Sequence, residues 1–83
     1  MLAVAGSDSG AGAGIQADLK TCAALGVYAA TVVTAVTAQN TLGVRHVEPV
    51  SRASVEAQLN AVFDDFNVAA VKSGSFPIGL WPT

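Results

Sequence analysis

The 83-residue sequence is poor in charge and nearly free of cysteine, and each scarcity excludes a class of partner or environment. Charged residues make up 12% of the chain, its four lysines and arginines are scattered singly, and its net charge is −2. Nucleic acids and anionic membrane surfaces attract clustered basic residues, so we expect neither as a partner. A single cysteine, Cys22, cannot form an internal disulfide, which favours a reducing, cytoplasmic environment.

Long apolar runs and metal-binding clusters are also missing. No uninterrupted apolar run reaches the roughly 18 residues that a membrane helix needs, and no basic region opens the chain, so neither a membrane span nor a secretion signal is expected. His46 is the only histidine and has no cysteine or carboxylate cluster near it in sequence. We therefore expect His46 on the surface or in packing, Cys22 in the core, and no metal site.

What the sequence does contain is a glycine-rich stretch around which the rest is organised. Gly6, Gly10, Gly12 and Gly14 follow a short apolar run and precede an amphipathic segment. Such a stretch predicts a tight strand-to-helix turn, whose backbone N–H groups either hold an anion or polar ligand or serve only to pack the helix. The dinucleotide and P-loop patterns both fail, because Ile15 stands where a glycine is needed and no lysine precedes Lys20.

Hydrophobic residues make up 52% of the chain, and their spacing predicts one small α/β domain. Strand, helix and strand follow one another as in a right-handed βαβ unit, and β-branched residues favour strands covered on both faces. We expect a three-layer fold with a mostly parallel sheet between flanking helices. The expected strands are 2–5, 28–36, 44–50 and 68–72. The first expected helix is 15–25, and Gly26 follows it as its C-terminal glycine. The second expected helix starts at Ser51 or Ser54 and ends near Asp65.

Two groups of polar residues stand out against this pattern. Asp18 falls within the apolar arc of the first helix, where a carboxylate needs a partner; it is either a buried cap or ion pair to the backbone, or part of a pocket. A polar cluster then follows the second strand, at the end of the sheet where open α/β folds bind ligands, although by position alone an ordinary polar loop is the more frequent explanation. The arc comprises Ile15, Leu19, Cys22 and Leu25; the cluster comprises Thr37, Gln39, Asn40 and Thr41; and Val55, Leu59, Val62 and Phe66 form a core stripe in the second helix.

Two long motifs carry a family resemblance. The segments 5–10 and 14–21 resemble the opening of the hydroxymethylpyrimidine/phosphomethylpyrimidine kinases of thiamine biosynthesis, which have a ribokinase-like fold, and segment 34–41 is similar to their second signature. The resemblance covers about residues 2 to 72, as the N-terminal part of such a kinase. Ala11 departs from it, because the family usually has another glycine there.

The resemblance implies an ATP-dependent kinase that phosphorylates the hydroxymethyl group of an aminopyrimidine and then its monophosphate. It implies that Gly6 lets the ring approach the backbone, Asp18 accepts from a ring-side donor, Gln39 reads the aminopyrimidine edge, and Thr37 contributes through its backbone. In the family, the catalytic base, the anion hole and the ATP site come from the C-terminal half. We therefore expect no catalytic residue, no site for ATP or Mg²⁺ and no activity in this chain alone; the full-length form is compatible with a homo-oligomer.

Two alternatives remain open: a pyridoxal-type kinase of the same fold, and a non-catalytic remnant or interaction fragment that pairs through the exposed edge of an all-parallel sheet. The tail bears on the second. Where the family continues Val-Lys-Ile-Gly, this chain reads Val71-Lys72-Ser73-Gly74. Loss of one base in the lysine codon can give this reading. We therefore expect residues 1–72 to be the kinase-like part and 73–83 a divergent tail from a frameshift or truncated gene model.

Overall fold

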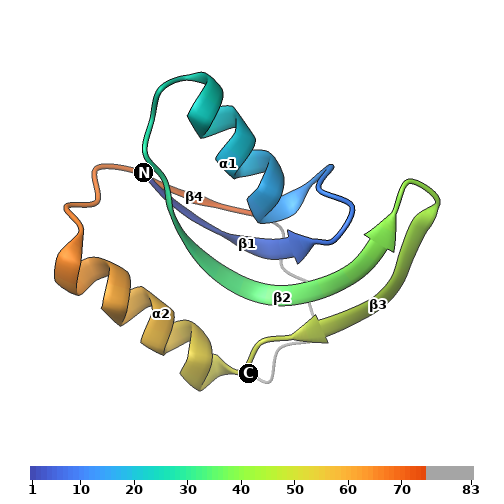
Figure 1. Cartoon of the computed structure of the whole chain (residues 1–83). Coiled ribbons are helices and arrows are strands. Elements are labelled where there is room, and N and C mark those ends of the chain that lie inside the picture. Colours follow the sequence, from blue (N-terminus) through green and yellow to red (C-terminus); the bar gives the residue numbers. More distant parts are fainter. Residues whose placement is uncertain (75–83) are drawn as a thin grey trace.

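The computed structural model describes residues 1–74, in which four strands and two helices alternate much as the sequence predicts (Figure 1). The elements are β1 (Leu2–Asp8), α1 (Gly14–Ala24), β2 (Ala30–Asn40), β3 (Gly43–Pro49), α2 (Arg52–Asp65) and β4 (Val71–Ser73). Neither helix is long and apolar enough to cross a membrane within this part of the chain.

The strands form a single sheet in the order β3-β2-β1-β4. β1 pairs in parallel with both β2 and β4, whereas β3 pairs antiparallel with β2. The α/β class and the mostly parallel sheet are confirmed, but the sheet is mixed, so the expectation of an all-parallel sheet is wrong. The reason is the short turn at Thr41 and Leu42, because so short a connection joins only antiparallel neighbours.

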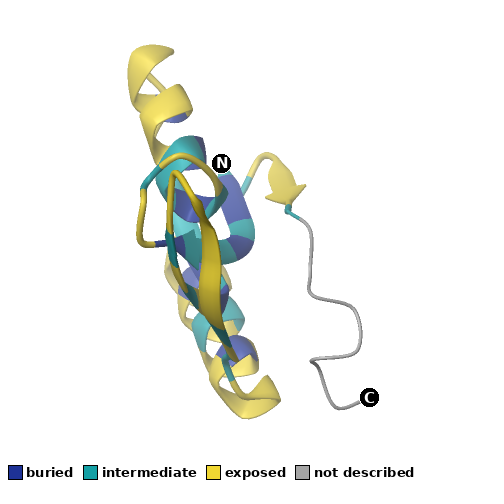
Figure 2. Ribbon diagram, turned by 90° about the vertical axis from the view of Figure 1, so that its right-hand side faces the viewer, coloured by how far each residue is buried: buried dark blue, intermediate teal, exposed yellow. Residues whose placement is uncertain are grey.

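Two apolar clusters, one on each face of the sheet, make the three layers. Successive side chains of β1 point to opposite faces: Leu2 packs with Val32, Val55 and Val62 under α2, while Ala3 and Ala5 pack with Ile15 of α1. Figure 1 shows the two helices on opposite sides of the sheet, and Figure 2 shows the buried residues lying between the layers. The sheet is therefore the centre of both cores.

The two helices begin and end close to the predicted residues, but they bury narrower stripes. Ser51 is the N-cap of α2, where its Oγ accepts from the N–H of Ser54 at 3.1 Å, and Gly26 follows α1 with a φ of +70°. Ile15 and Cys22 are buried as expected, but Leu19, Leu25 and Phe66 are 39%, 74% and 41% exposed. α1 packs chiefly on the single strand β1, which covers only a narrow strip of the helix.

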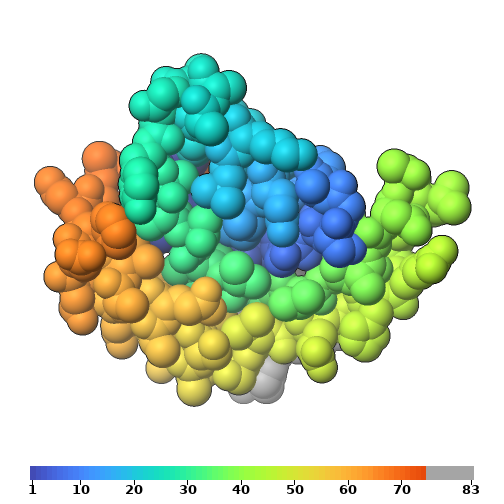
Figure 3. Space-filling view, in the orientation of Figure 1, coloured from blue at the N-terminus to red at the C-terminus, as the bar shows by residue number. Residues whose placement is uncertain are grey.

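β1 and β2 continue beyond their predicted ends. β2 includes Thr37, Gln39 and Asn40, so the expectation that this polar cluster follows the strand is wrong. Pairing with β3 extends β2 to Asn40, past its last pairing with β1 at Thr37. The resulting hairpin projects from the body of the molecule, and its tip (yellow-green) stands apart in the space-filling view (Figure 3).

β4 is shorter than predicted and forms the exposed edge of the sheet (Figure 2). Ser73 still pairs with Val4, and the N–H of Gly74 donates to the carbonyl of Val4 at 2.7 Å, so the first two residues of the predicted tail continue the edge strand. The rest of that tail, residues 75–83, lies outside the described residues.

Candidate ligand-binding pocket

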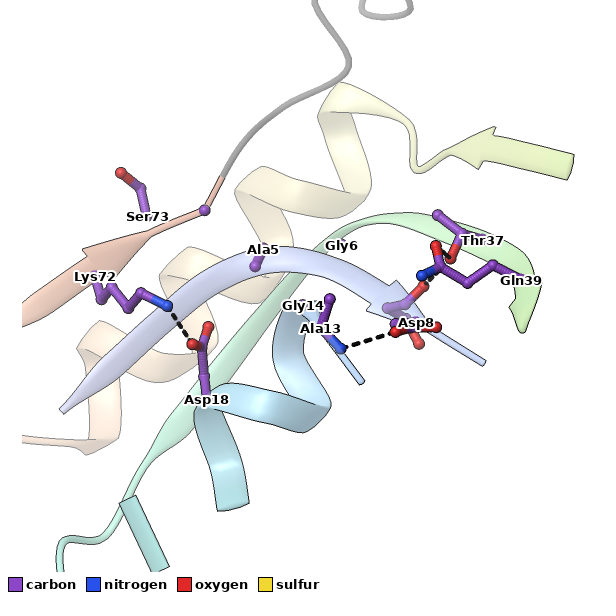
Figure 4. A pocket seen from close by; sticks show the side chains of 12 residues that line it. Ala5, Gly6, Asp8, Ala13, Gly14, Asp18, Thr37, Gln39, Lys72 and Ser73 are labelled. Carbon is purple, nitrogen blue, oxygen red and sulfur yellow. Dashed lines mark hydrogen bonds and ion pairs between the residues drawn. The ribbon is translucent and has the colours of Figure 1, made fainter. Parts of the chain in front are cut away.

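A pocket of about 530 Å³ opens where β1 and β4 end and α1 begins (Figure 4). Its wall includes all four predicted site residues, Gly6, Asp18, Thr37 and Gln39, which come from β1, α1 and β2. The structure thus brings together residues that are up to 33 positions apart in the sequence, the distance from Gly6 to Gln39. The carboxyl ends of parallel strands are where open α/β sheets bind ligands.

The glycine-rich loop beside this pocket is organised by a carboxylate that was not among the predicted site residues. Asp8 Oδ1 accepts from the N–H of Gly10 at 2.7 Å, and Oδ2 accepts from the N–H groups of Gly12 and Ala13 at 3.0 and 2.8 Å. The loop therefore does hold an anion at the start of α1, but that anion belongs to the chain itself. The available signal was the aspartate directly before a glycine-rich turn, since aspartates there often accept from nearby N–H groups.

Two residues of this loop have left-handed backbone conformations. Gly14 has a φ of +62°, and a Cβ on it would overlap the carbonyl oxygen of Gly6. Ala11 has a φ of +61°, a conformation that costs an L-residue with a side chain about 1–2 kcal/mol. The family resemblance predicts a glycine at position 11, and the backbone conformation there gives a physical reason why Ala11 is the less favourable residue.

The pocket wall between β1 and β2 is held by side-chain hydrogen bonds. Thr37 Oγ1 lies 2.8 Å from the carbonyl oxygen of Ser7 and 3.0 Å from Oε1 of Gln39, and its single proton is donated to one of them at a time. The N–H of Gln39 donates to Oγ of Ser9 at 2.7 Å, and that hydroxyl donates to the Gln39 carbonyl at 2.7 Å. Thr37 thus contributes its side chain to the structure of the wall.

Gln16 ties α1 to the last residues of β1 and was also not predicted. Its Nε2 donates to Oγ of Ser7 at 2.7 Å, and its Oε1 accepts from the N–H of Asp8 at 2.8 Å. The first turn of α1 is therefore fixed to the strand that forms the pocket floor.

Asp18 has a side-chain partner across the pocket. It is 8% exposed, and its Oδ1 forms an ion pair with Nζ of Lys72 on β4 (Figure 4). The partner that a buried carboxylate needs is thus a lysine side chain, not a helix cap or the backbone, and the carboxylate also lines the pocket. Lys72 was missed because 54 residues separate it from Asp18 and no local pattern links them.

Histidine and cysteine take no part in the pocket. His46 is exposed on β3, and Cys22 is buried with its Sγ 3.6 Å from the sulfur of Met1. Within residues 1–74, no group of three or more histidine, cysteine, aspartate or glutamate side chains is arranged to hold a metal ion.

Comparison with known proteins places these observations in a family. The family model described as phosphomethylpyrimidine kinase matches residues 8–77. The chain belongs to the phosphomethylpyrimidine kinase family. The match runs past Lys72, and a domain boundary at that residue stays a prediction.

Curated relatives in the phosphomethylpyrimidine kinase family are close in sequence but much longer. The hydroxymethylpyrimidine/phosphomethylpyrimidine kinase of Rhizobium meliloti is 67% identical over 73 residues, which are 88% of this chain and 27% of that protein. The chloroplastic thiamine biosynthetic bifunctional enzyme of Arabidopsis thaliana is 60% identical over 77 residues, which are 93% of this chain and 15% of that protein. The chain therefore spans about a quarter or less of these two relatives.

Solved structures agree with the ribokinase-like α/β fold. Phosphomethylpyrimidine kinase from Clostridium difficile 630 superposes with a TM-score of 0.88 at 53% identity, over 90% of this chain and 32% of that one. Pyridoxal kinase from Staphylococcus aureus, in complex with AMP-PCP and pyridoxal, superposes with a TM-score of 0.81 at 36% identity, over 92% of this chain and 29% of that one.

Proposed function

We propose that this chain forms the pyrimidine-binding part of an ATP-dependent kinase that phosphorylates hydroxymethylpyrimidine and then its monophosphate. The observation that carries the proposal is the convergence of Gly6, Asp18, Thr37 and Gln39 on one pocket. These are the residues that the family resemblance assigns to the substrate, and they come from three separate elements. The chain is 67% identical to a hydroxymethylpyrimidine/phosphomethylpyrimidine kinase and 53% identical to a phosphomethylpyrimidine kinase, which supports a pyrimidine substrate.

Each residue has a role that its geometry supports. Gln39 offers both a donor and an acceptor, which suits the edge of an aminopyrimidine, and Asp18 accepts from a ring-side amino group. A Cβ on Gly6 would meet nothing closer than the Ala35 carbonyl oxygen at 3.6 Å, so packing among the described residues does not require glycine there. Close approach of a ligand ring supplies a reason for it. Thr37 positions Gln39 beside it.

ATP and Mg²⁺ belong, in this proposal, to segments of the longer relatives that the chain does not span. The glycine-rich loop does not fit the phosphates, because Asp8 already occupies the N–H groups of Gly10, Gly12 and Ala13. A second anionic group would meet like charge there. The chain's own residues therefore bind and orient the pyrimidine, and we assign none of them to phosphoryl transfer.

A fusion protein tests this proposal. Residues 1–72 replace the matching segment of the Rhizobium meliloti relative, which is 67% identical over 73 residues; we refer to this protein as the 1–72 fusion. With ATP and Mg²⁺, the 1–72 fusion is expected to phosphorylate hydroxymethylpyrimidine and then its monophosphate, whereas the 83-residue chain alone yields no product. A folded fusion without this activity contradicts the assignment, and turnover by the chain alone contradicts the expected absence of a catalytic group.

The pyridoxal-type alternative is favoured by the TM-score of 0.81 with the Staphylococcus aureus pyridoxal kinase. The same fusion distinguishes it: preference for pyridoxal over hydroxymethylpyrimidine in kcat/KM supports a pyridoxal kinase.

The interaction-fragment alternative is favoured by the exposed edge strand β4. A chain that binds no pyrimidine but self-associates through that edge supports the fragment.

The setting of the protein is also part of the proposal. We place the kinase in the cytoplasm, supported by the single cysteine, although the Arabidopsis thaliana relative is named as chloroplastic. A homo-oligomeric full-length form is proposed on the family resemblance, and the molar mass of the 1–72 fusion in solution tests it.

A further inference from the structure

Lys72 enters the pocket from a strand that carries none of the predicted site residues. It lies in register with Ala3 of β1, and Ala3 packs with Ile15 on the α1 face of the sheet. Neighbours in register on adjacent strands point to the same face, so Lys72 points towards α1, where Asp18 is. Figure 4 shows the two side chains meeting beside β1.

The two partners of this ion pair differ in how far they are removed from water. The side chain of Asp18 is 9% exposed, whereas that of Lys72 is 54% exposed. A buried carboxylate without a partner is costly, but a half-exposed ammonium group is hydrated without help. The carboxylate therefore depends on the lysine much more than the lysine depends on the carboxylate.

Space lies on both sides of the ion pair. Asp18 and Lys72 line the 530 Å³ pocket and also a second cavity of about 240 Å³, whose wall includes Met1, Cys22 and Leu25. An aspartate side chain at such a shared wall can turn towards either space. Among residues 1–74, the hydrogen bond to Lys72 engages only Oδ1, so Oδ2 is available to a ligand.

We propose that Lys72 is a positioning residue, which holds Asp18 so that Oδ2 faces the amino group of the pyrimidine in the larger pocket. This inference rests on the proposed function. Lys72 acts through Asp18 and does not itself contact the ligand. Loss of the ammonium group releases the carboxylate to turn towards the second cavity. Arginine at this position retains a cation and the ion pair, so it preserves the orientation.

The test measures hydroxymethylpyrimidine binding to the ¹⁵N-labelled 83-residue chain by chemical-shift titration of the folded form. Lys72→Met and Asp18→Asn are each expected to raise the Kd about ten-fold or more, since a hydrogen bond to a charged group is removed. The double variant is expected to match Asp18→Asn alone, because the two residues act as a unit. Lys72→Arg is expected to bind within about three-fold of the original chain.

Controls separate this role from a purely structural one. Arg52→Met removes the exposed ion pair between Arg52 and Glu56 on α2, whose N–O distance is 3.6 Å, and is expected to leave the Kd unchanged. The amide spectrum of each variant reports its folded fraction, for which the Kd is corrected. If Lys72→Met does not fold, Lys72→Gln takes its place. Glutamine keeps a neutral donor but loses the charge, so it is expected to raise the Kd more than Lys72→Arg does, by about three- to ten-fold.

The outcomes distinguish this inference from the proposed function. A chain that binds, with an unchanged Kd in Lys72→Met, overturns the role of Lys72 only. Equal weakening by Lys72→Met in the original chain and in the Asp18→Asn variant also overturns it, because the lysine then contacts the ligand directly. A chain whose amide spectrum shows that it is folded, but which shows no titration at all, overturns the pocket assignment itself.

Discussion

At the scale of single residues, the proposed role that is most directly testable is that of the Gln39 amide, which lies on the pocket wall. Gln39→Leu in the 1–72 fusion keeps the approximate volume of the side chain and removes both of its polar groups. The polar edge of the bound pyrimidine is then buried without partners, so kcat/KM for hydroxymethylpyrimidine should fall about ten-fold to a few hundred-fold. Steady-state kinetics measure this, and the KM for ATP should change little. An unchanged kcat/KM in a folded variant would show that the Gln39 side chain does not contact the substrate.

Ala11 offers a test of backbone strain in the neighbouring loop. Ala11→Gly relieves the cost of a φ of +61°, although glycine also raises the entropy of the unfolded chain. The net effect should be a gain of about 0.5–1 kcal/mol in the unfolding free energy of the 1–72 fusion, measured by urea denaturation. Ala69→Gly is the matched control, because Ala69 is exposed, lies outside the helices and strands, and does not have a positive φ. Equal effects of the two substitutions would count against strain at Ala11.

The site residues that could be predicted from the sequence are those whose neighbours in the chain form a recognisable pattern. Residues whose contacts depend on tertiary packing could not be predicted. Asp18 was predictable because a carboxylate interrupts an apolar arc within one helix. Its partner Lys72 was not, because the contact spans 54 residues and depends on how β4 pairs with β1. Gln16 was likewise missed, since its two hydrogen bonds to Ser7 and Asp8 depend on how α1 docks on the strand.

At the scale of elements, α2 is attached to β2 by a side-chain amide as well as by apolar packing. Gln58 Oε1 accepts from the N–H of Val33 at 2.8 Å, and its Nε2 donates to the carbonyl of Val33 at 3.0 Å. β3 pairs with β2 only from Ala35 onward. The N–H and carbonyl of Val33 therefore lie on a part of β2 that β3 does not reach. The amide of Gln58 therefore takes the place of a neighbouring strand.

Replacing Gln58 tests how much this attachment contributes. Gln58→Leu leaves the part-buried N–H and carbonyl of Val33 without partners, so the unfolding free energy of the 1–72 fusion should fall by about 2 kcal/mol in urea denaturation. Asn60→Leu, at an exposed position of the same helix, is the control and should change it by no more than about 0.5 kcal/mol. Similar losses in both variants would show that the amide pairing contributes nothing specific.

The order and type of all six elements were predictable from hydrophobic spacing and turn residues, as the N-cap at Ser51 illustrates. The strand ends were not. β2 continues to Asn40 because β3 folds back on it, and that pairing is a tertiary contact that overrides the polar character of Thr37 and Gln39. The same hairpin is why Thr37 and Gln39 lie on a strand and not in a loop.

At the scale of the whole molecule, the buried apolar core is small. Within residues 1–74, the large apolar residues with buried side chains are Leu2, Ile15, Val32, Val55 and Val62. Many others are substantially exposed, among them Leu25, Tyr28, Leu42 and Phe63 at 74%, 72%, 88% and 55%. With so few large side chains buried, the described part of the chain has less core than a typical stable domain.

We therefore expect the isolated 83-residue chain to be marginally folded. Circular dichroism during heating should show a broad loss of signal, whereas the 1–72 fusion, which supplies more covering surface, should unfold in a sharp transition. Sedimentation at the same concentration establishes whether the chain is monomeric. A sharp, cooperative transition from a monomer of the 83-residue chain would contradict this expectation.

The carboxylate of Asp8 also sets how the glycine-rich loop responds to its surroundings. The three N–H groups it accepts from are joined to it by only a few residues of chain, so they experience it at a very high effective concentration. Free phosphate or sulfate at millimolar levels competes poorly with such a tethered ion. The loop should accordingly keep its shape whether buffer anions or phosphorylated metabolites are scarce or abundant, and so should the wall of the proposed pyrimidine pocket that this loop adjoins.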